Sequence, residues 1–98
     1  MDAQMIKTLQ DYFATQPVLK AWVFGSFARG EETPESDVDL LVVYDDKTGV
    51  SLLKHAAMTV DLEDMLNRPV DIVEEGTLLP FAVASANRDR IIVYERTN

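Results

Sequence analysis

Several features that define other classes of protein are missing from this sequence of 98 residues. It has no cysteine, which excludes a disulfide framework and a thiolate metal site and fits a reducing cytoplasm. No apolar run approaches the roughly 20 residues of a membrane-spanning helix, so we expect no association with a membrane. Internal repeats and low-complexity tracts are also lacking. We therefore expect one domain over residues 1–98, with 47% hydrophobic residues available for a modest core.

Basic residues are scarce. The sequence has 9 Lys and Arg against 17 Asp and Glu, which gives a formal net charge of −8. Proteins that grip nucleic acid depend on Lys and Arg contacts to phosphate, so direct binding to nucleic acid is disfavoured. The simplest interpretation of the acidity is solubility.

The hydrophobic pattern alternates between the periods of helices and strands, which predicts an α/β domain with a mixed sheet. The apolar stripe of the second long helix, Leu52, Leu53, Ala56, Ala57 and Val60, is expected to be buried, with Leu62, Met65 and Leu66 continuing it. Lys54 and His55 of that helix are expected in solvent, and Trp22 in the core or at its rim. The predicted elements are helix 3–15, strands 18–24 and 38–44, helix 51–67, strand 70–73, helix 77–87, a turn at 87–89 and strand 91–94.

The first chemical signal is a Gly-Ser pair at the end of the apolar run 21–24. Gly25 has no Cβ, so the backbone can turn tightly there and a ligand can approach it closely. Ser26 is predicted to cap a short helix, whose free N–H groups favour an anion, and Arg29 adds a positive charge one turn later. The segment therefore predicts a phosphate site.

The second signal is a pair of carboxylates at the start of the next apolar strand. Asp37 and Asp39 occupy alternate positions, so on a strand they project from the same face. Two acids side by side on a strand rich in Leu and Val are unfavourable unless a cation joins them. A divalent metal is the simplest such cation, and together with the phosphate site it describes a nucleoside triphosphate with its magnesium.

At these residues the chain resembles a known family. Gly25-Ser26, ten further residues and then Asp37-Val38-Asp39 is similar to the signature of the polymerase β-like nucleotidyltransferase superfamily. The compact form, Gly-Ser-Phe-Ala-Arg-Gly followed by Ser-Asp-Val-Asp-Leu-Leu-Val, resembles the minimal nucleotidyltransferases called MNT. The resemblance implies the nucleotidyltransferase fold, a mixed sheet of about four strands flanked by helices.

The resemblance also implies roles for three aspartates. Asp37 and Asp39 would bridge two Mg²⁺ ions, and a third acid would come from a neighbouring strand. Asp71 stands at the matching place, between apolar neighbours of strand 70–73. Without the resemblance, Asp71 would be interpreted as an exposed residue on an alternating edge strand. As the third acid it would hold the catalytic metal near the acceptor hydroxyl and help to remove its proton.

By the same resemblance, Gly25 and Ser26 would bind the β- and γ-phosphates, and Arg29 would assist. The reaction would be attack of a hydroxyl on the α-phosphate of ATP with release of pyrophosphate. The chain is too short for the extra helical domain that shapes the acceptor site of larger relatives, so a second chain would have to supply that pocket.

Stand-alone MNT proteins resemble the antitoxins of pairs whose partner is a HEPN-domain ribonuclease toxin, which implies transfer of AMP to a tyrosine of that toxin. Two alternatives stay open. One is an antitoxin that neutralises its partner by occlusion without catalysis. The other is a small-molecule nucleotidyltransferase of the aminoglycoside type, completed by dimerisation, and the chain is in any case a possible homo-oligomer.

Overall fold

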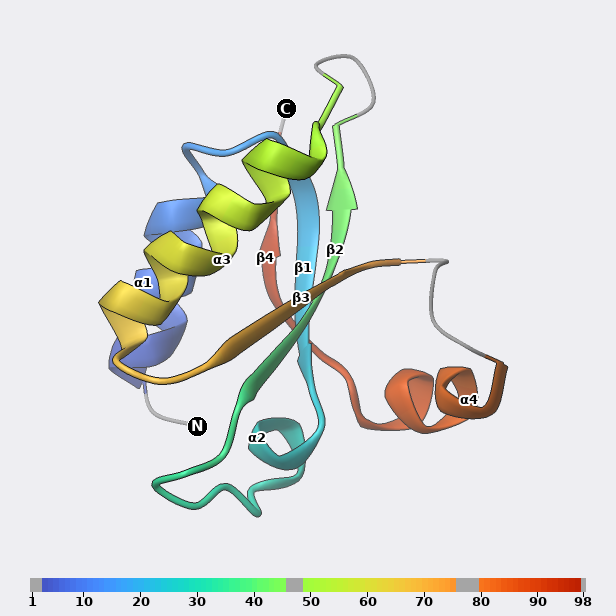
Figure 1. Cartoon of the computed structure of the whole chain (residues 1–98). Coiled ribbons are helices and arrows are strands. Elements are labelled where there is room, and N and C mark those ends of the chain that lie inside the picture. The colour runs from blue at the N-terminus through green and yellow to red at the C-terminus, as the bar shows by residue number, and fades with distance from the viewer. Residues whose placement is uncertain (1–2, 46–48, 76–79, 98) are drawn as a thin grey trace.

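The computed structural model describes residues 3–45, 49–75 and 80–97 (Figure 1). In these ranges no helix combines the length and the apolar character that crossing a membrane requires. The elements in chain order are α1 (Ala3–Phe13), β1 (Val18–Phe24), α2 (Ser26–Arg29), β2 (Val38–Tyr44), α3 (Leu52–Leu66), β3 (Val70–Glu74), α4 (Pro80–Asp89) and β4 (Ile91–Glu95).

The strands form one mixed sheet in the order β3-β2-β1-β4. Strand β1 is antiparallel to both of its neighbours, whereas β2 and β3 are parallel and are joined by the crossover helix α3. A parallel pair needs such a crossover, because a short turn cannot return the chain to the same end of the sheet. The predicted α/β architecture, a four-stranded mixed sheet flanked by helices, is confirmed.

Helices α1 and α3 lie on the same side of the sheet and bury its first face (Figure 1). The core side chains come from α1, from α3 and from alternate positions of the strands, and include Leu9, Phe13, Val23, Leu40, Val42, Met58, Leu62 and Ile72. Since successive side chains of a strand point to opposite faces, the second face receives Trp22, Asp39 and Asp71. The candidate acids are therefore separated from the main core by the sheet itself.

The long helix α3 lies where the sequence predicted it, but its buried face is a different one. Ser51 caps it, with the Ser51 hydroxyl accepting a hydrogen bond from the backbone N–H of Lys54 at 3.0 Å. Its fully buried side chains are Met58 and Leu62. The stripe from Leu52 to Val60 and the side chain of Met65 are exposed, so the prediction of their burial was wrong. Because this helix is apolar on two faces, periodicity alone cannot show which face meets the sheet.

Two boundaries also differ from the sequence prediction. Residues 87–89, predicted as a turn, complete helix α4, because the backbone N–H of Arg90 still bonds to the carbonyl of Ala86 at 2.9 Å. Strand β4 follows directly at Ile91. Helix α1 ends at Phe13, because the N–H groups of Thr15 and Gln16 bond to carbonyls only three residues back, in a tighter turn before Pro17. The predicted cap Thr77 lies outside the described residues.

Candidate active site

The turn after β1 brings Gly25 directly against the carboxylate of Asp39. Strands β1 and β2 are paired so that Phe24, the last residue of β1, lies opposite Asp39. Gly25 follows with φ 71° and ψ −150°, a conformation essentially restricted to glycine. A Cβ at Gly25 would lie 2.5 Å from Asp39 Oδ2, well inside van der Waals contact. The two halves of the signature therefore meet, and Gly25 is required both by its backbone angles and by its neighbour.

The short helix α2 begins one residue earlier than the sequence suggested. Gly25 occupies the N-cap position without any side-chain cap bond, and Ser26 is the first helical residue, so the prediction that Ser26 caps the helix was wrong. Phe27 is buried and anchors the helix in the core. Gly30 ends it in the left-handed conformation, with φ 72°. This places the half-buried Ser26 beside the turn, next to the Gly25 backbone.

The parallel register of β2 and β3 places Asp39 directly opposite Asp71. The ladder starts with the N–H of Val38 bonding to the carbonyl of Pro69 at 3.0 Å, which fixes the two strands with these aspartates level. Asp37 immediately precedes β2, is exposed, and lies two residues before Asp39 along the chain. Asp71 is exposed on the edge strand β3. Asp71 therefore lies on an edge strand, as the alternating pattern predicted, and it is paired with Asp39.

The electrostatics of Asp39 report on these neighbours. Burial is the main cause that raises the pKa of the Asp39 carboxyl above its usual range, and the negative charge of Asp71 adds to it. Asp37 raises the Asp39 pKa further, whereas Arg29 opposes the shift. A carboxylate whose charged form is disfavoured by burial and by two acids is where a cation would be held most favourably.

The chemistry of these donors fits magnesium. Three aspartates offer hard oxygen ligands, which Mg²⁺ prefers together with phosphate oxygens and water. Within the described ranges, no three His, Cys, Asp or Glu side chains are gathered closely enough to hold a metal ion as they stand. Binding would therefore need the carboxylates to converge, and Asp37 and Asp71 are exposed and have room to turn. Asp39, half-buried against Gly25, would be the fixed member.

Arg29, which was predicted to assist in phosphate binding, forms ion pairs with two acidic side chains. Its Nη1 donates to Asp89 Oδ2 at 3.0 Å, and its Nε donates to Glu31 Oε2 at 3.3 Å. Asp89 is the last residue of α4, so this ion pair joins α2 to α4 beside the candidate site. Arg29 would have to exchange one of these partners to reach a phosphate.

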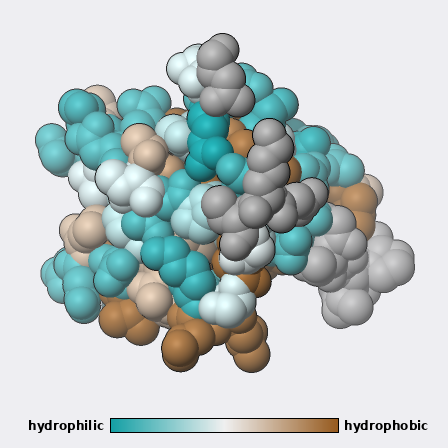
Figure 2. All heavy atoms as spheres, turned by 90° about the horizontal axis from the view of Figure 1, so that it is seen from above, coloured by the Kyte–Doolittle hydropathy of each residue, from teal (hydrophilic) through white to brown (hydrophobic). Residues whose placement is uncertain are grey.

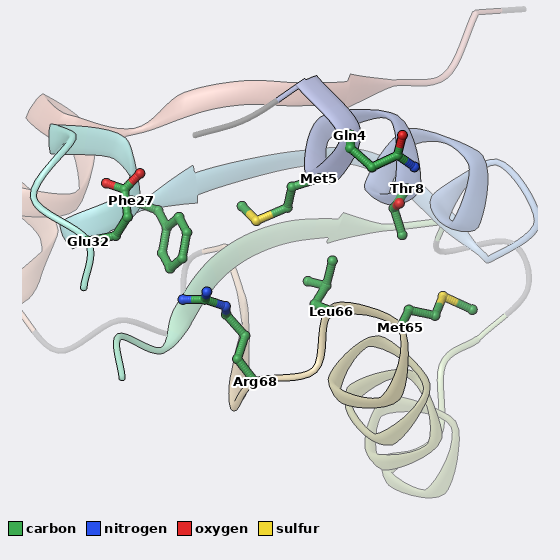
Figure 3. Close-up of a pocket in the computed structure, with 8 residues that line it drawn as sticks. All are labelled: Gln4, Met5, Thr8, Phe27, Glu32, Met65, Leu66 and Arg68. Atoms are coloured by element: carbon green, nitrogen blue, oxygen red, sulfur yellow. The ribbon is translucent and has the colours of Figure 1, made fainter. Parts of the chain in front are cut away.

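Sequence reasoning missed Arg68, which lies between the predicted helix 51–67 and the predicted strand 70–73. The Nη1 atom of Arg68 donates to the carbonyl oxygens of Ser36, at 3.2 Å, and Thr33, at 3.4 Å. Its guanidinium also lies 4.8 Å from the centre of the Phe27 ring, and Figure 3 shows it directed towards that ring. Arg68 therefore touches the residue after Ser26 and the residue before Asp37, the two halves of the signature. No local pattern in the sequence marks such a long-range contact.

The same view shows a pocket of about 550 Å³ on the helical side of the molecule (Figure 3). Its walls come from α1, α2, the end of α3 and the loop before β2, and include Met5, Thr8, Phe27, Glu32, Leu66 and Arg68. None of the candidate acids lines it. The pocket therefore lies apart from the Asp39–Asp71 pair.

His55 is also remote from the acids. It is half-buried and forms a hydrogen bond with the hydroxyl of Tyr44, 2.5 Å from His55 Nδ1. Tyr44 ends β2, at the opposite end of the strand from Asp39. This hydrogen bond gives His55 a structural role.

Comparison with known proteins indicates the family to which this chain is related. Residues 3–94 match the sequence model of a family described as a nucleotidyltransferase domain. A candidate protein adenylyltransferase of Methanocaldococcus jannaschii is 32% identical over 88 residues, which cover 89% of this chain and 85% of that protein. The match extends well beyond the two short motifs.

Two solved structures are similar in fold. One, of a candidate minimal nucleotidyltransferase, has a TM-score of 0.73 at 36% identity and covers 93% of this chain and 95% of its own. The other is a chain in the tri-AMPylated Shewanella oneidensis HEPN toxin in complex with an MNT antitoxin. It has a TM-score of 0.71 at 13% identity and covers 98% of this chain and 74% of its own. At that identity the second likeness shows a shared fold alone.

Proposed function

The chain belongs to the nucleotidyltransferase domain family, and from this premise we propose that it transfers AMP from ATP to a hydroxyl of a partner protein. The observation that carries the proposal is the Asp39–Asp71 pair, level across two parallel strands, with the Gly25 backbone packed against Asp39. AMP is the proposed group because a relative of 32% identity carries the name of a protein adenylyltransferase.

In the proposed reaction, the acceptor hydroxyl oxygen forms a bond to the α-phosphorus of ATP. The bond from that phosphorus to the oxygen bridging it to the β-phosphate breaks, and pyrophosphate leaves. Magnesium ions, when bound, neutralise the triphosphate and the charge that develops on the attacking and leaving oxygens. Asp37 and Asp39 would hold both ions, and Asp71 would hold the one nearest the acceptor.

The other residues position the reactants. Asp71, exposed at the edge of the sheet, can accept the proton that the acceptor hydroxyl releases. Gly25 allows the β- and γ-phosphates to approach the backbone closely, and the hydroxyl of Ser26 can donate a hydrogen bond to them. Arg29 would add a positive charge on release from Asp89. Orientation and charge neutralisation of this kind supply most of the catalysis in phosphoryl-type transfers.

We further propose that the acceptor is a tyrosine of a HEPN-family toxin and that the chain acts as its antitoxin. The support is the fold shared with the complex of an AMPylated HEPN toxin and an MNT antitoxin. The exposure of the Asp71 side chain also agrees with an acceptor that another protein delivers.

The test is to incubate the chain with ATP labelled on its α-phosphate, magnesium chloride and the product of the neighbouring gene, and to weigh both proteins intact. The partner should gain the mass of one or more AMP groups. Asp39→Asn and Asp71→Asn should abolish the gain. Asp11→Asn, which only breaks the exposed ion pair with Lys7 on α1, should leave it unchanged. A partner that stays unmodified by the folded wild-type chain would overturn AMP transfer.

Occlusion without catalysis is separated by a neutralisation assay in cells. The double variant Ser26→Ala, Asp37→Ala should still bind the toxin but fail to neutralise it. Full neutralisation by this variant would favour occlusion. Transfer to an aminoglycoside in the absence of any partner protein would favour the small-molecule alternative.

A further inference from the structure

The outer face of α3 is an apolar surface without a neighbour among the described residues. Leu52 is 85% exposed, Leu53 81% and Val60 55%. Ala56 and Ala57 lie between them and are exposed as well. Figure 2 shows hydrophobic residues gathered along the lower edge of the molecule in that view. A contiguous group of exposed large apolar side chains on one helix is typical of a protein–protein contact.

This face, which we call the α3 outer face, comprises Leu52, Leu53, Ala56, Ala57 and Val60. It has large side chains at its N-terminal end and small ones in its middle. Small residues allow a second helix to approach closely, and the leucines can then pack on either side of the crossing point. The face therefore has the shape that one helix presents to another.

The charges beside the outer face differ between the two halves of α3. Lys54 lies in the first half, and Asp61 follows it by two helical turns, so both lie on the same flank. Glu63 and Asp64 add further negative charge to the second half. Two copies of α3 packed antiparallel would set the basic half of each against the acidic half of the other. Packed parallel, they would set like charges against each other.

We propose that the α3 outer face binds a second copy of this chain, with the two α3 helices antiparallel and the twofold axis beside Ala57. Lys54 of each copy then lies beside Asp61 of the other. The face is complementary to itself, as a twofold interface requires, and burial of Leu52 and Leu53 supplies the driving force.

The proposed dimer has a consequence for the active site. Helix α3 covers the first face of the sheet, whereas Asp39 and Asp71 lie on the second. Joining two copies through α3 leaves both acid pairs open and places no residue of one copy over the acids of the other. The dimer would therefore not complete the acceptor pocket.

The test is a charge exchange read by sedimentation equilibrium of the full chain. Wild type should dimerise. Lys54→Glu alone and Asp61→Lys alone should each raise the dimer dissociation constant at least tenfold, because each sets like charges together. An equimolar mixture of the two variants should recover dimers, because the glutamate introduced into one variant meets the lysine introduced into the other only in the antiparallel arrangement. Circular dichroism checks folding, since Asp61→Lys also removes the bond from the Tyr12 hydroxyl to Asp61, 2.7 Å long.

Cysteine cross-linking gives a second measurement that does not depend on charge. The sequence has no cysteine, so an introduced one reports on its own position. Ala57→Cys should form a disulfide-linked dimer under mild oxidation. Leu53→Cys should not, because the two copies of residue 53 would be about 13 Å apart along the helices, beyond the reach of a disulfide. Met65→Cys, exposed on another side of α3, is the control for random encounters.

Three results would overturn the proposal. The first is a wild-type chain that stays monomeric at its highest soluble concentration. The second is a mixture of the charge variants that stays monomeric while both variants are folded. The third is equal cross-linking at residues 53 and 57. The first would leave the outer face to a different protein. The last would indicate a parallel or random contact.

Discussion

Asp39 and Asp71 are direct neighbours in the parallel ladder between β2 and β3, so two carboxylates stand level on one face of the sheet. They are far apart in the sequence, and only the crossover through α3 brings them together. Burial of Asp39 and the charge of Asp71 both raise the Asp39 pKa, so the pair is unfavourable when nothing cationic lies beside it. Such local conflict in an otherwise consistent fold is typical of a functional site.

The first prediction concerns Gly25, for which the chain offers a matched control. Gly25→Ala introduces strain at φ 71° and pushes a Cβ to 2.5 Å from Asp39 Oδ2. Gly30→Ala introduces milder strain, because φ 72° and ψ 22° lie in the left-handed helical region, and its Cβ would meet nothing within 4 Å. We expect Gly30→Ala to lower the free energy of unfolding by about 1–2 kcal/mol and to keep most activity. Gly25→Ala should cost about 1–3 kcal/mol for the backbone alone and abolish transfer, because the Asp39 carboxylate is displaced.

Urea unfolding measures the stabilities, and AMP transfer measures the activity. Equal activity of the two alanine variants would show that the contact between Gly25 and Asp39 does not position a reacting group.

The second prediction concerns the pH dependence of stability in metal-free protein. The unfolded chain releases the Asp39 proton around the ordinary pKa of 3.8, whereas the folded protein releases it at a higher pKa. Between these values the folded state holds a proton that the unfolded state has lost, so the contribution of Asp39 to stability falls as pH rises. Above the folded pKa the whole penalty is present, and below 3.8 it is absent.

Asp39→Asn should therefore be more stable than wild type at pH 7 in the presence of EDTA, and the advantage should disappear below about pH 4. Urea unfolding at a series of pH values measures this difference. Asp11→Asn, on the exposed surface of α1, is the control and should show no such gain. A constant difference between Asp39→Asn and wild type at all pH values would contradict the role of ionisation.

The sequence predicted the parts of the fold that depend on local chemistry, and it indicated a candidate site. A Gly-Ser pair after an apolar run and two aspartates at alternate strand positions were enough to indicate a phosphate and metal site, because the period of a strand fixes which side chains share a face. The role of Asp71 was predicted from the resemblance, because an exposed acid on an edge strand does not by itself indicate a function. Its pairing with Asp39 is visible only in the register.

Features that depend on tertiary contacts could not be predicted. Helix α3 is apolar on two faces, and only packing decides that Met58 and Leu62 turn inward while Leu53 stays exposed. Arg68 contacts the carbonyl of Ser36, which is distant along the chain. No periodic pattern in the sequence indicates such a contact.

The third prediction assigns Arg68 a positioning role. By bonding to the Ser36 carbonyl and lying over Phe27, its side chain fixes the loop that carries Asp37 against the helix that begins at Ser26. Arg68→Ala should reduce kcat by about 10–100-fold, as the loss of a residue that orients metal ligands commonly does, with a smaller change in the KM for ATP. Arg68→Lys should recover only part of the rate, because an ammonium lacks the planar fork.

The matched control is Arg90→Ala, since Arg90 lies over the Trp22 ring at 4.6 Å but contacts neither half of the signature. If Arg68→Ala and Arg90→Ala lowered kcat equally after correction for the folded fraction, Arg68 would be a structural residue only. Steady-state kinetics at several ATP concentrations separate kcat from KM.

The last prediction concerns magnesium and the charge balance around Asp39. Magnesium would bind the folded acids and not the unfolded chain, so it should stabilise by RT ln(1 + [L]/Kd), about 1 kcal/mol at five times Kd. For a domain of this size, that raises the melting temperature by roughly 4–8 °C. Asp71→Asn should melt higher than wild type without metal, because it relieves the repulsion on Asp39, and it should lose most of the magnesium increment.

Two controls separate binding from general screening in a chain with a net charge of −8. Sodium chloride at equal ionic strength should stabilise wild type and Asp71→Asn by similar amounts. Glu35→Gln removes an exposed negative charge from the loop before β2 without removing a proposed ligand, so it should keep the magnesium increment. If magnesium and matched sodium chloride shifted the melting temperature equally in all three proteins, the three aspartates would not form a metal site. AMP transfer would then need another mechanism.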